Sequence, residues 1–186
     1  MPVLEPVVTQ ESSAEPVASA LPPTVRAALL DPRAWQDGLY RFSLATNLGV
    51  ALVDAEGLSL TSRNPQPLWR LFRQKRPASP GGCPFALAPV RPCTCVAKAL
   101  ETGCWALADD RTGLVHFAVP LVLGEERLGA LLAGQVFTQY PEQLAVERVA
   151  EQFGLPPGRA WQLARREQLV KQATLKVYAD LLATLG

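Results

Sequence analysis

Residues 101–140 read ETGCWALADDRTGLVHFAVPLVLGEERLGALLAGQVFTQY and contain two long apolar runs. Apolar side chains are nearly continuous over 114–123 and again over 128–137, with Gly-Glu-Glu-Arg at 124–127 between them. Two such runs joined by a short turn are typical of antiparallel strands that form a hairpin. The sequence therefore predicts that this hairpin is the centre of a β-sheet.

Shorter elements are predicted on both sides of the hairpin. Before it, the spacing of apolar residues predicts helices over 25–30, 32–45, 67–74 and 93–102, and strands over 49–54, 58–62 and 105–108. After it we expect a helix over 141–153 and a last helix over 160–185, about 39 Å long at 1.5 Å per residue. This order predicts an α+β fold of PAS or GAF type. It has an antiparallel sheet of about five strands, flanking helices packed on one face and a long C-terminal helix.

Length and composition indicate one folded domain. The chain has 186 residues, of which 48% are hydrophobic, and this is enough for one packed core and too little for two ordinary domains. Residues 1–23 are rich in proline without any apolar period, so we expect a disordered leader there. We divide the remainder into a domain over 24–156 and a C-terminal signalling or dimerisation helix over 157–186.

Charge and hydropathy exclude several classes of function. The formal net charge is +1 and the basic residues are scattered, so the basic surface of a nucleic-acid-binding protein is not expected. The apolar run over 114–124 is shorter than the roughly 18–20 residues of a membrane-spanning helix. We also find no signal-peptide pattern and no glycine-rich phosphate loop. We therefore expect a cytoplasmic protein with no nucleic-acid partner, no membrane partner and no nucleotide cofactor.

The four cysteines, Cys83, Cys93, Cys95 and Cys104, are close together in the sequence. Cysteines of a cytoplasmic protein are more often thiols, metal ligands or small buried side chains than disulfides. Four thiolates within one short segment suit a zinc ion or an iron–sulfur cluster, although Cys-x-Cys is not the spacing of a zinc ribbon. Both a cofactor-free protein and a metal site at these four residues therefore remain open.

Several residues near the hairpin are candidates for contact with a small molecule. His116, the single histidine, lies on a strand that we expect to be buried, and Gln135 lies at the end of the last apolar strand. A buried imidazole or amide needs hydrogen-bond partners, which the protein interior or a ligand can supply. Trp69, Phe72 and Trp105 are candidate walls of an apolar pocket. No recognisable nucleophile–base motif accompanies His116, so we do not expect an enzyme.

Three groups of residues give the sequence a family resemblance. They lie over 30–57, which includes GVALVDAEG, over 102–121, which includes TG, GL and FAVPL, and over 128–137, which includes LG and GQVF. The GQVF string at 134–137 is the most specific of these. In these features the chain, over roughly residues 30–154, resembles the PocR-type sensory domain. That domain is a PAS-like ligand-binding module usually attached to histidine kinases and transcription regulators.

The resemblance implies a function as well as a fold. It implies a non-enzymatic sensory domain over 24–156 that binds a small, partly apolar organic molecule, such as an alcohol, and signals through the C-terminal helix. A histidine kinase or a transcription regulator is the implied output partner, and Asp110 is placed at the rim of the pocket. The family commonly has cysteines at the positions of Trp69 and Asp110, so the cysteines of this chain do not map cleanly onto the family pattern.

Two other functions remain as alternatives. One is a metal or redox sensor that uses the four cysteines, and the other is a degenerate domain that serves as an adaptor or dimerisation module. We also expect a homodimer, because the last helix carries two apolar stripes and one packing face can bury only one of them. The stripes are Val170, Ala173, Val177 and Leu181, and Tyr178, Leu182 and Leu185.

Overall fold

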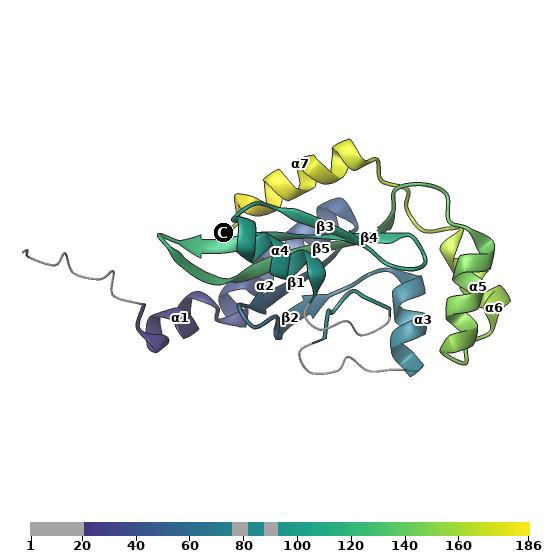
Figure 1. Cartoon of the computed structure of the whole chain (residues 1–186), viewed down its shortest axis with the longest axis horizontal. Coiled ribbons are helices and arrows are strands. Elements are labelled where there is room, and N and C mark those ends of the chain that lie inside the picture. The colour runs from purple at the N-terminus through teal and green to yellow at the C-terminus, as the bar shows by residue number, and fades with distance from the viewer. Residues whose placement is uncertain (1–20, 76–81, 88–92) are drawn as a thin grey trace, which may run out of the picture.

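The computed structural model describes residues 21–75, 82–87 and 93–186. Within these ranges the chain forms an α+β fold around a five-stranded antiparallel sheet with the order β2-β1-β5-β4-β3 (Figure 1). The strands are β1 (Gly49–Asp54), β2 (Ser59–Arg63), β3 (Ala106–Asp109), β4 (Leu114–Leu123) and β5 (Glu126–Phe137). The helices are α1 (Pro23–Leu29), α2 (Pro32–Thr46), α3 (Pro67–Lys75), α4 (Thr94–Thr102), α5 (Gln143–Gln152), α6 (Pro157–Ala164) and α7 (Gln172–Ala183). The predicted fold class is confirmed.

The predicted hairpin is β4 and β5, and it lies at the centre of the sheet. The two strands pair from Leu114 opposite Phe137 to Leu123 opposite Glu126, and β1 pairs with the other side of β5. Residues 128–137 are all buried, because β5 has a strand on each side and packed side chains on each face. The expected leader over 1–23 lies outside the described residues except for its last three positions, and α1 begins at Pro23.

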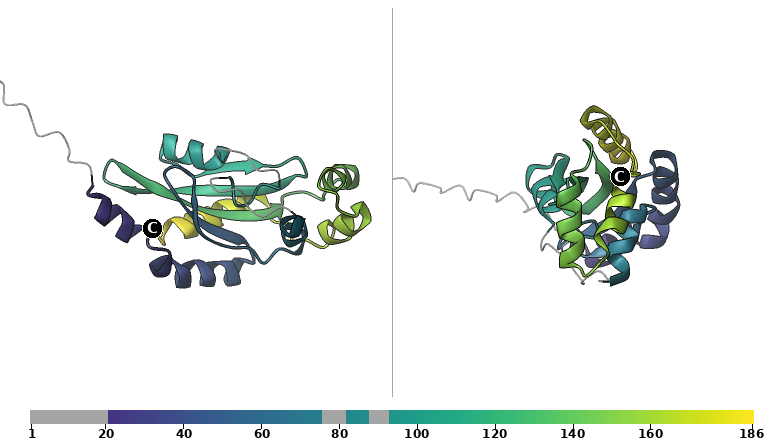
Figure 2. Two further views of the ribbon diagram at one scale, coloured as in Figure 1. Left: turned by 90° about the horizontal axis from the view of Figure 1, so that it is seen from below. Right: turned by 90° about the vertical axis from the view of Figure 1, so that its right-hand side faces the viewer.

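Both faces of the sheet are covered. On one face α2 and α7 pack against a core that includes Val50, Phe117 and Leu131. On the other face α4 packs against Ala118 and Leu132 (Figure 2). The expectation that helices pack on one face only is therefore wrong. The physical reason lies in the central strands, where successive residues are buried and each face needs its own cover.

A β-bulge interrupts the pairing of β4 and β5 beside His116. His116 is opposite Gly134 and Val115 is opposite Val136, so Gln135 is the extra residue of the bulge. Gln135 has a φ of 66° and Gly134 a φ of 142°. A Cβ atom on Gly134 would overlap the Cα of His116 and lie 2.7 Å from the carbonyl oxygen of Val115. The glycine is therefore required for the strands to meet here, and the bulge turns the side chain of Gln135 to the same face as His116.

The C-terminal helix is shorter than expected. The predicted continuous helix over 160–185 is divided into α6 and α7 by residues 165–171. In this link Glu167 accepts a hydrogen bond from the backbone N–H of Leu68 at 2.9 Å, and Val170 is buried and donates its N–H to the carbonyl of Phe137 at 2.9 Å. No glycine or proline lies at the break, so these tertiary contacts override the local preference for helix.

A separate apolar cluster closes one end of the sheet. It joins α3, α5 and α6 to the strand ends through Phe72, Phe137, Val146 and Ala160. The ring of Phe72 meets that of Phe153 edge-on with the centroids 5.2 Å apart. In the described part of the chain no helix has the length and apolar character to cross a membrane.

The bulge generates a prediction about stability. Gly134→Ala should lower the free energy of unfolding by about 2–4 kcal/mol, because the added methyl group meets backbone atoms that have no room to move. Gly38→Ala is the control, since nothing lies within 4 Å of an added Cβ in the middle of α2, and this change should raise stability by about 0.5–1 kcal/mol. Urea unfolding measures both. Equal stability of the Gly134→Ala variant and the wild type would contradict the account of the bulge.

Candidate functional site

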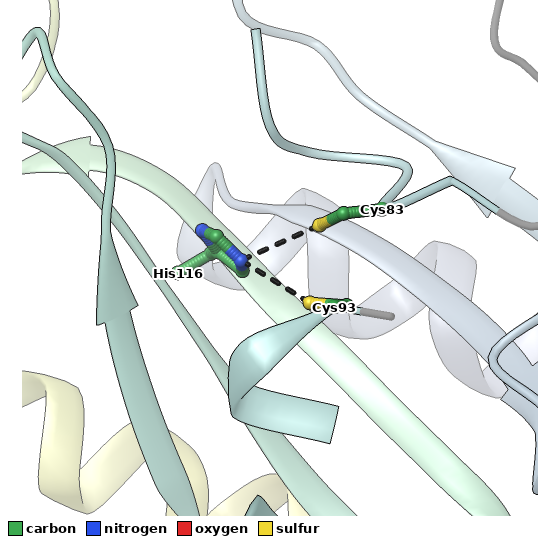
Figure 3. Close-up of side chains that lie close together, drawn as sticks. All are labelled: Cys83, Cys93 and His116. Atoms are coloured by element: carbon green, nitrogen blue, oxygen red, sulfur yellow. Dashed lines mark hydrogen bonds between the residues drawn. The ribbon is translucent and has the colours of Figure 1, made fainter. Parts of the chain in front are cut away.

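Three buried side chains meet on the α4 face of the sheet: Cys83, Cys93 and His116 (Figure 3). The Nε2 atom of His116 lies 3.4 Å from the Sγ atom of Cys83 and 3.5 Å from the Sγ atom of Cys93. The Nε2 atom and both sulfurs all lie within 4.8 Å of one another. The three residues come from separate parts of the chain, namely residues 82–87, the residue before α4, and β4.

The sheet and α4 fix two members of this cluster. The bulge places His116 against Gly134, with its side chain on the face that α4 covers. Cys93 is the N-cap residue of α4, and its carbonyl accepts the N–H of Ala97 at 3.0 Å. The Sγ atom of Cys95, two residues further along the chain, lies 3.4 Å from that of Cys93.

Residues 82–87 have no regular secondary structure, and side-chain donors hold them in place. The Nη2 atom of Arg73 donates to the carbonyls of Cys83 at 3.2 Å and Pro84 at 2.8 Å. The indole N–H of Trp69 donates to Pro84 at 3.1 Å, and the amide of Gln135 donates to the carbonyl of Phe85. Buried carbonyl groups need such partners. Cys83 is therefore positioned by α3 on one side and by the bulge residue on the other.

Burial and mutual contact shift the pKa values of Cys83 and His116. A hydrogen bond with Cys93, together with burial, raises the pKa of Cys83 to about 12. Burial lowers the pKa of His116, but hydrogen bonds and charge from Cys83 and Cys93 raise it to about 10. Both shifts favour the protonated form of the group at pH 7. A cation that enters the cluster must therefore displace protons from it.

A cavity of about 490 Å³ lies beside the cluster. This volume is within the range of about 300–1,000 Å³ that is typical of pockets for small ligands. Its apolar walls are Ala86, Leu87, Ala108, Val149 and Phe153. Its polar walls are Thr94, Asp109, Asp110, Arg111, Thr112 and Gln152, together with the three residues of the cluster.

The two carboxylate oxygens of Asp110 differ in their hydrogen bonding. Its Oδ1 atom accepts hydrogen bonds from the backbone N–H and the hydroxyl of Thr112, at 2.8 and 2.5 Å, and from the N–H of Leu114 at 3.1 Å, which fixes the β3–β4 turn. Its Oδ2 atom is buried without a partner among the described residues, as is the Nδ1 atom of His116. Burial raises the pKa of Asp110, against the effect of these hydrogen bonds. Two polar atoms of the cavity wall are thus unpartnered in the part of the chain that is described.

The structure brings together only some of the predicted site residues. Asp110 and His116 line the cavity. Gln135 and Trp69 do not line it, but they donate hydrogen bonds to carbonyls of residues 82–87. Phe72 is buried in the core of α3, α5 and α6, next to the cavity residue Phe153. Trp105 lies on the opposite face of the sheet, where it meets Phe117 edge-on with the centroids 6.4 Å apart.

The four cysteines do not form one cluster. Cys83, Cys93 and Cys95 are buried, but Cys104 is exposed beyond the other end of α4. The nine residues of that helix span about 13 Å, which separates Cys104 from Cys93. His116 takes a place in the cluster instead, although it stands far from the cysteines in sequence. Arg73, Thr112 and Val149 are further residues of the site that the sequence analysis missed, because no local pattern distinguishes them from other surface or core residues.

The arrangement predicts how the thiols react. With Ellman's reagent the native protein should show one fast thiol, Cys104, and three slow ones, because the other cysteines are buried. Arg73→Leu should speed up the slow reaction, since residues 82–87 then lose their main donor at a cost of about 1–3 kcal/mol. Arg70→Leu, a change at an exposed position of the same helix, is the control. Equal slow rates in the two variants would show that Arg73 does not hold this segment.

Comparison with known protein families gives a match. Residues 28–186 match the family model described as PocR, the sensory domain found in PocR. No curated protein and no solved structure gives a significant match. The matched region covers nearly the whole chain and includes α6 and α7 as well as the sheet. The chain therefore belongs to the family of PocR sensory domains.

Proposed function

We propose that this domain is a non-enzymatic sensor that binds a small organic molecule with a hydroxyl group in the cavity beside His116. The observation that carries the proposal is a pair of atoms in the wall of one cavity, Oδ2 of Asp110 and Nδ1 of His116, that have no partner among the residues that the structure describes. A buried polar atom is costly without a hydrogen bond. A hydroxyl group both donates and accepts, so one such group on a ligand can satisfy either atom.

The character of the cavity supports a ligand that is partly apolar. Ala86, Leu87, Val149 and Phe153 offer aliphatic and aromatic contact for its carbon atoms. Membership of a sensory-domain family agrees with a role in ligand sensing. Cys83 is a poor candidate for a catalytic nucleophile, because its pKa is raised to about 12, whereas a catalytic thiol beside histidine needs a lowered pKa.

The position of β4 supports one route for the signal. His116 points toward the cavity, while its neighbours Val115 and Phe117 belong to the core under α7. Leu175, Ala179 and Leu182 are the side chains by which α7 packs on that core. A shift of β4 on ligand binding therefore changes how α7 packs on the other face of the sheet. We infer that α7 carries the signal to an output partner, such as a kinase or a transcription regulator.

A thermal-shift screen tests the ligand and its site. A panel of small alcohols, diols and aromatic acids should include a compound that stabilises the wild type. A hundredfold excess over its Kd adds about 2.7 kcal/mol, which corresponds to roughly 5–10 °C in a domain of this size. Asp110→Asn should abolish most of this shift, because it keeps an oxygen for the turn and replaces the unpartnered acceptor with a donor.

Asp54→Asn is the matched control for this screen. Asp54 also holds a turn through one oxygen, which accepts the N–H of Leu58 at 2.7 Å, but it lies at the β1–β2 end, outside the cavity residues. Its variant should respond to the compound like the wild type. A compound that stabilises the Asp110→Asn variant fully would place its site elsewhere. A panel without any effect would favour the adaptor function instead.

We further propose that the domain forms a homodimer through α7. Val177 and Leu181 lie one turn apart on this helix and are 62% and 48% exposed, on the side away from Leu175 and Ala179. The double substitution Val177→Glu and Leu181→Glu should convert a dimer into monomers, because the added charges cannot be buried at an apolar contact. Light scattering measures the mass. Leu144→Glu on α5, at a leucine that is 66% exposed, should leave the mass unchanged. A monomeric wild type would refute the dimer.

A further inference from the structure

The distances within the cluster of Cys83, Cys93 and His116 match those between the ligands of a metal ion. Tetrahedral zinc has Zn–S distances of about 2.3 Å and Zn–N distances of about 2.0–2.1 Å, so its nitrogen and sulfur ligands are about 3.5 Å apart. The observed separations from Nε2 of His116 are 3.4 and 3.5 Å. The whole set lies within 4.8 Å, whereas two sulfurs on one zinc are about 3.8 Å apart. Only small shifts are needed to close the site around an ion.

A hydrogen bond to the imidazole explains the approach of only one of the two sulfurs. An imidazole Nε2 atom has either one hydrogen or one lone pair, and it can direct that single group at one partner only. Here two sulfurs lie at nearly the same distance from it. A cation on the lone-pair axis of Nε2 contacts both sulfurs at once. A metal ion therefore accounts for the approach of both sulfurs to one nitrogen atom, whereas a thiol–imidazole hydrogen bond accounts for only one of them.

The surroundings of the cluster also suit a metal. The Nδ1 atom of His116 has no protein partner among the described residues, and a histidine that binds metal through Nε2 keeps its Nδ1–H for an outer acceptor. Asp110 offers a buried, unpartnered Oδ2 atom in the same cavity wall. The Sγ atom of Cys95 lies 3.4 Å from that of Cys93 and can donate its S–H to a bound thiolate. These are the outer contacts that orient and stabilise metal ligands.

We propose that Cys83, Cys93 and His116 bind one Zn²⁺ ion and leave its fourth coordination position facing the cavity. On binding, both thiols and the Nε2 atom of His116 release their protons to solvent, and Zn²⁺ with two thiolates and a neutral imidazole has no net charge. This balance avoids the cost of a buried unpaired charge. Two thiolates with an imidazole are a ligand set that suits zinc, and three protein ligands are typical of zinc sites that keep an open position.

The open position narrows the class of ligand for the proposed sensor. All three metal ligands line the 490 Å³ cavity, so a molecule in it can reach the ion. The fourth ligand would then be the hydroxyl oxygen of the organic molecule, bound to Zn²⁺ and donating its hydrogen to Asp110. This second step rests on the proposed function, but the zinc site itself does not.

Metal analysis of the full chain tests the site. Protein purified under reducing conditions without chelator, and then metal-free protein titrated with Zn²⁺, should bind one ion per chain. Cys83→Ser, Cys93→Ser and His116→Ala should each weaken binding by more than about 100-fold, beyond the usual effect of an outer-contact change. Cys104→Ser is the matched control, an exposed cysteine outside the cluster, and it should bind as the wild type does.

Spectra of the Co²⁺-loaded wild type keep the test independent of any variant that fails to fold. Thiolate-to-metal absorption together with tetrahedral visible bands is the expected result. Failure to bind a metal, or equal binding by the Cys83→Ser and Cys104→Ser variants, would overturn the site. Loss of the tetrahedral spectrum in Cys95→Ser would make Cys95 the fourth ligand and overturn the open position.

The alcohol panel applied to metal-free and Zn²⁺-loaded protein separates the two proposals. Stabilisation that requires zinc supports both. One ion per chain with no response to any alcohol supports the zinc site and contradicts the proposed ligand class. Equal stabilisation of the metal-free protein, with no zinc bound, contradicts the metal site and leaves the sensor function in place.

Discussion

The close approach of β5 to β4 at Gly134 is the contact on which the site depends. A side chain at this position would overlap His116, so only glycine lets the two strands pair there. The extra residue of the bulge, Gln135, then turns toward residues 82–87 and binds the carbonyl of Phe85. One irregularity in the ladder thus positions the imidazole and also anchors the segment that carries Cys83. The irregular pairing of the central hairpin thus positions a histidine that lines the cavity.

The site combines rigid and loosely built parts. His116 and Cys93 belong to a central strand and a helix terminus, while Cys83 lies in a segment without regular structure that Arg73 and Trp69 hold through its carbonyls. Burial lowers the pKa of Arg73, so its charge is placed there at some cost. The carbonyls that it satisfies would otherwise be buried without donors. Hydrogen bonds from side chains therefore satisfy the backbone carbonyls of residues 82–87, as hydrogen bonds to a neighbouring strand do in a sheet.

Local pattern predicts the sheet well and the site only in part. The apolar runs over 114–123 and 128–137 determine the hairpin, because strands buried on both faces are apolar at every position. Alternation also places His116 and Phe117 on opposite faces, but it does not tell which face carries the cavity, and Trp105 lies with Phe117 on the face opposite His116. The gathering of Cys83, Cys93 and His116 depends on hydrogen bonds from Arg73 and Gln135 to distant carbonyls, and no periodicity records such contacts.

The break between α6 and α7 changes what the C-terminal helix can do mechanically. A continuous helix over 160–185 would be a stiff rod, and any tilt at one end would be carried to the other. The link over 165–171 instead ties the chain to the sheet through the parallel bridge of Phe137 with Leu169 and the hydrogen bond of Val170 to Phe137, and α7 begins after it. Because α7 packs on the core of the sheet and is not continuous with α6, its orientation depends on the strands beneath it. We therefore expect a displacement of β4 to reach α7 directly, without passing through α6.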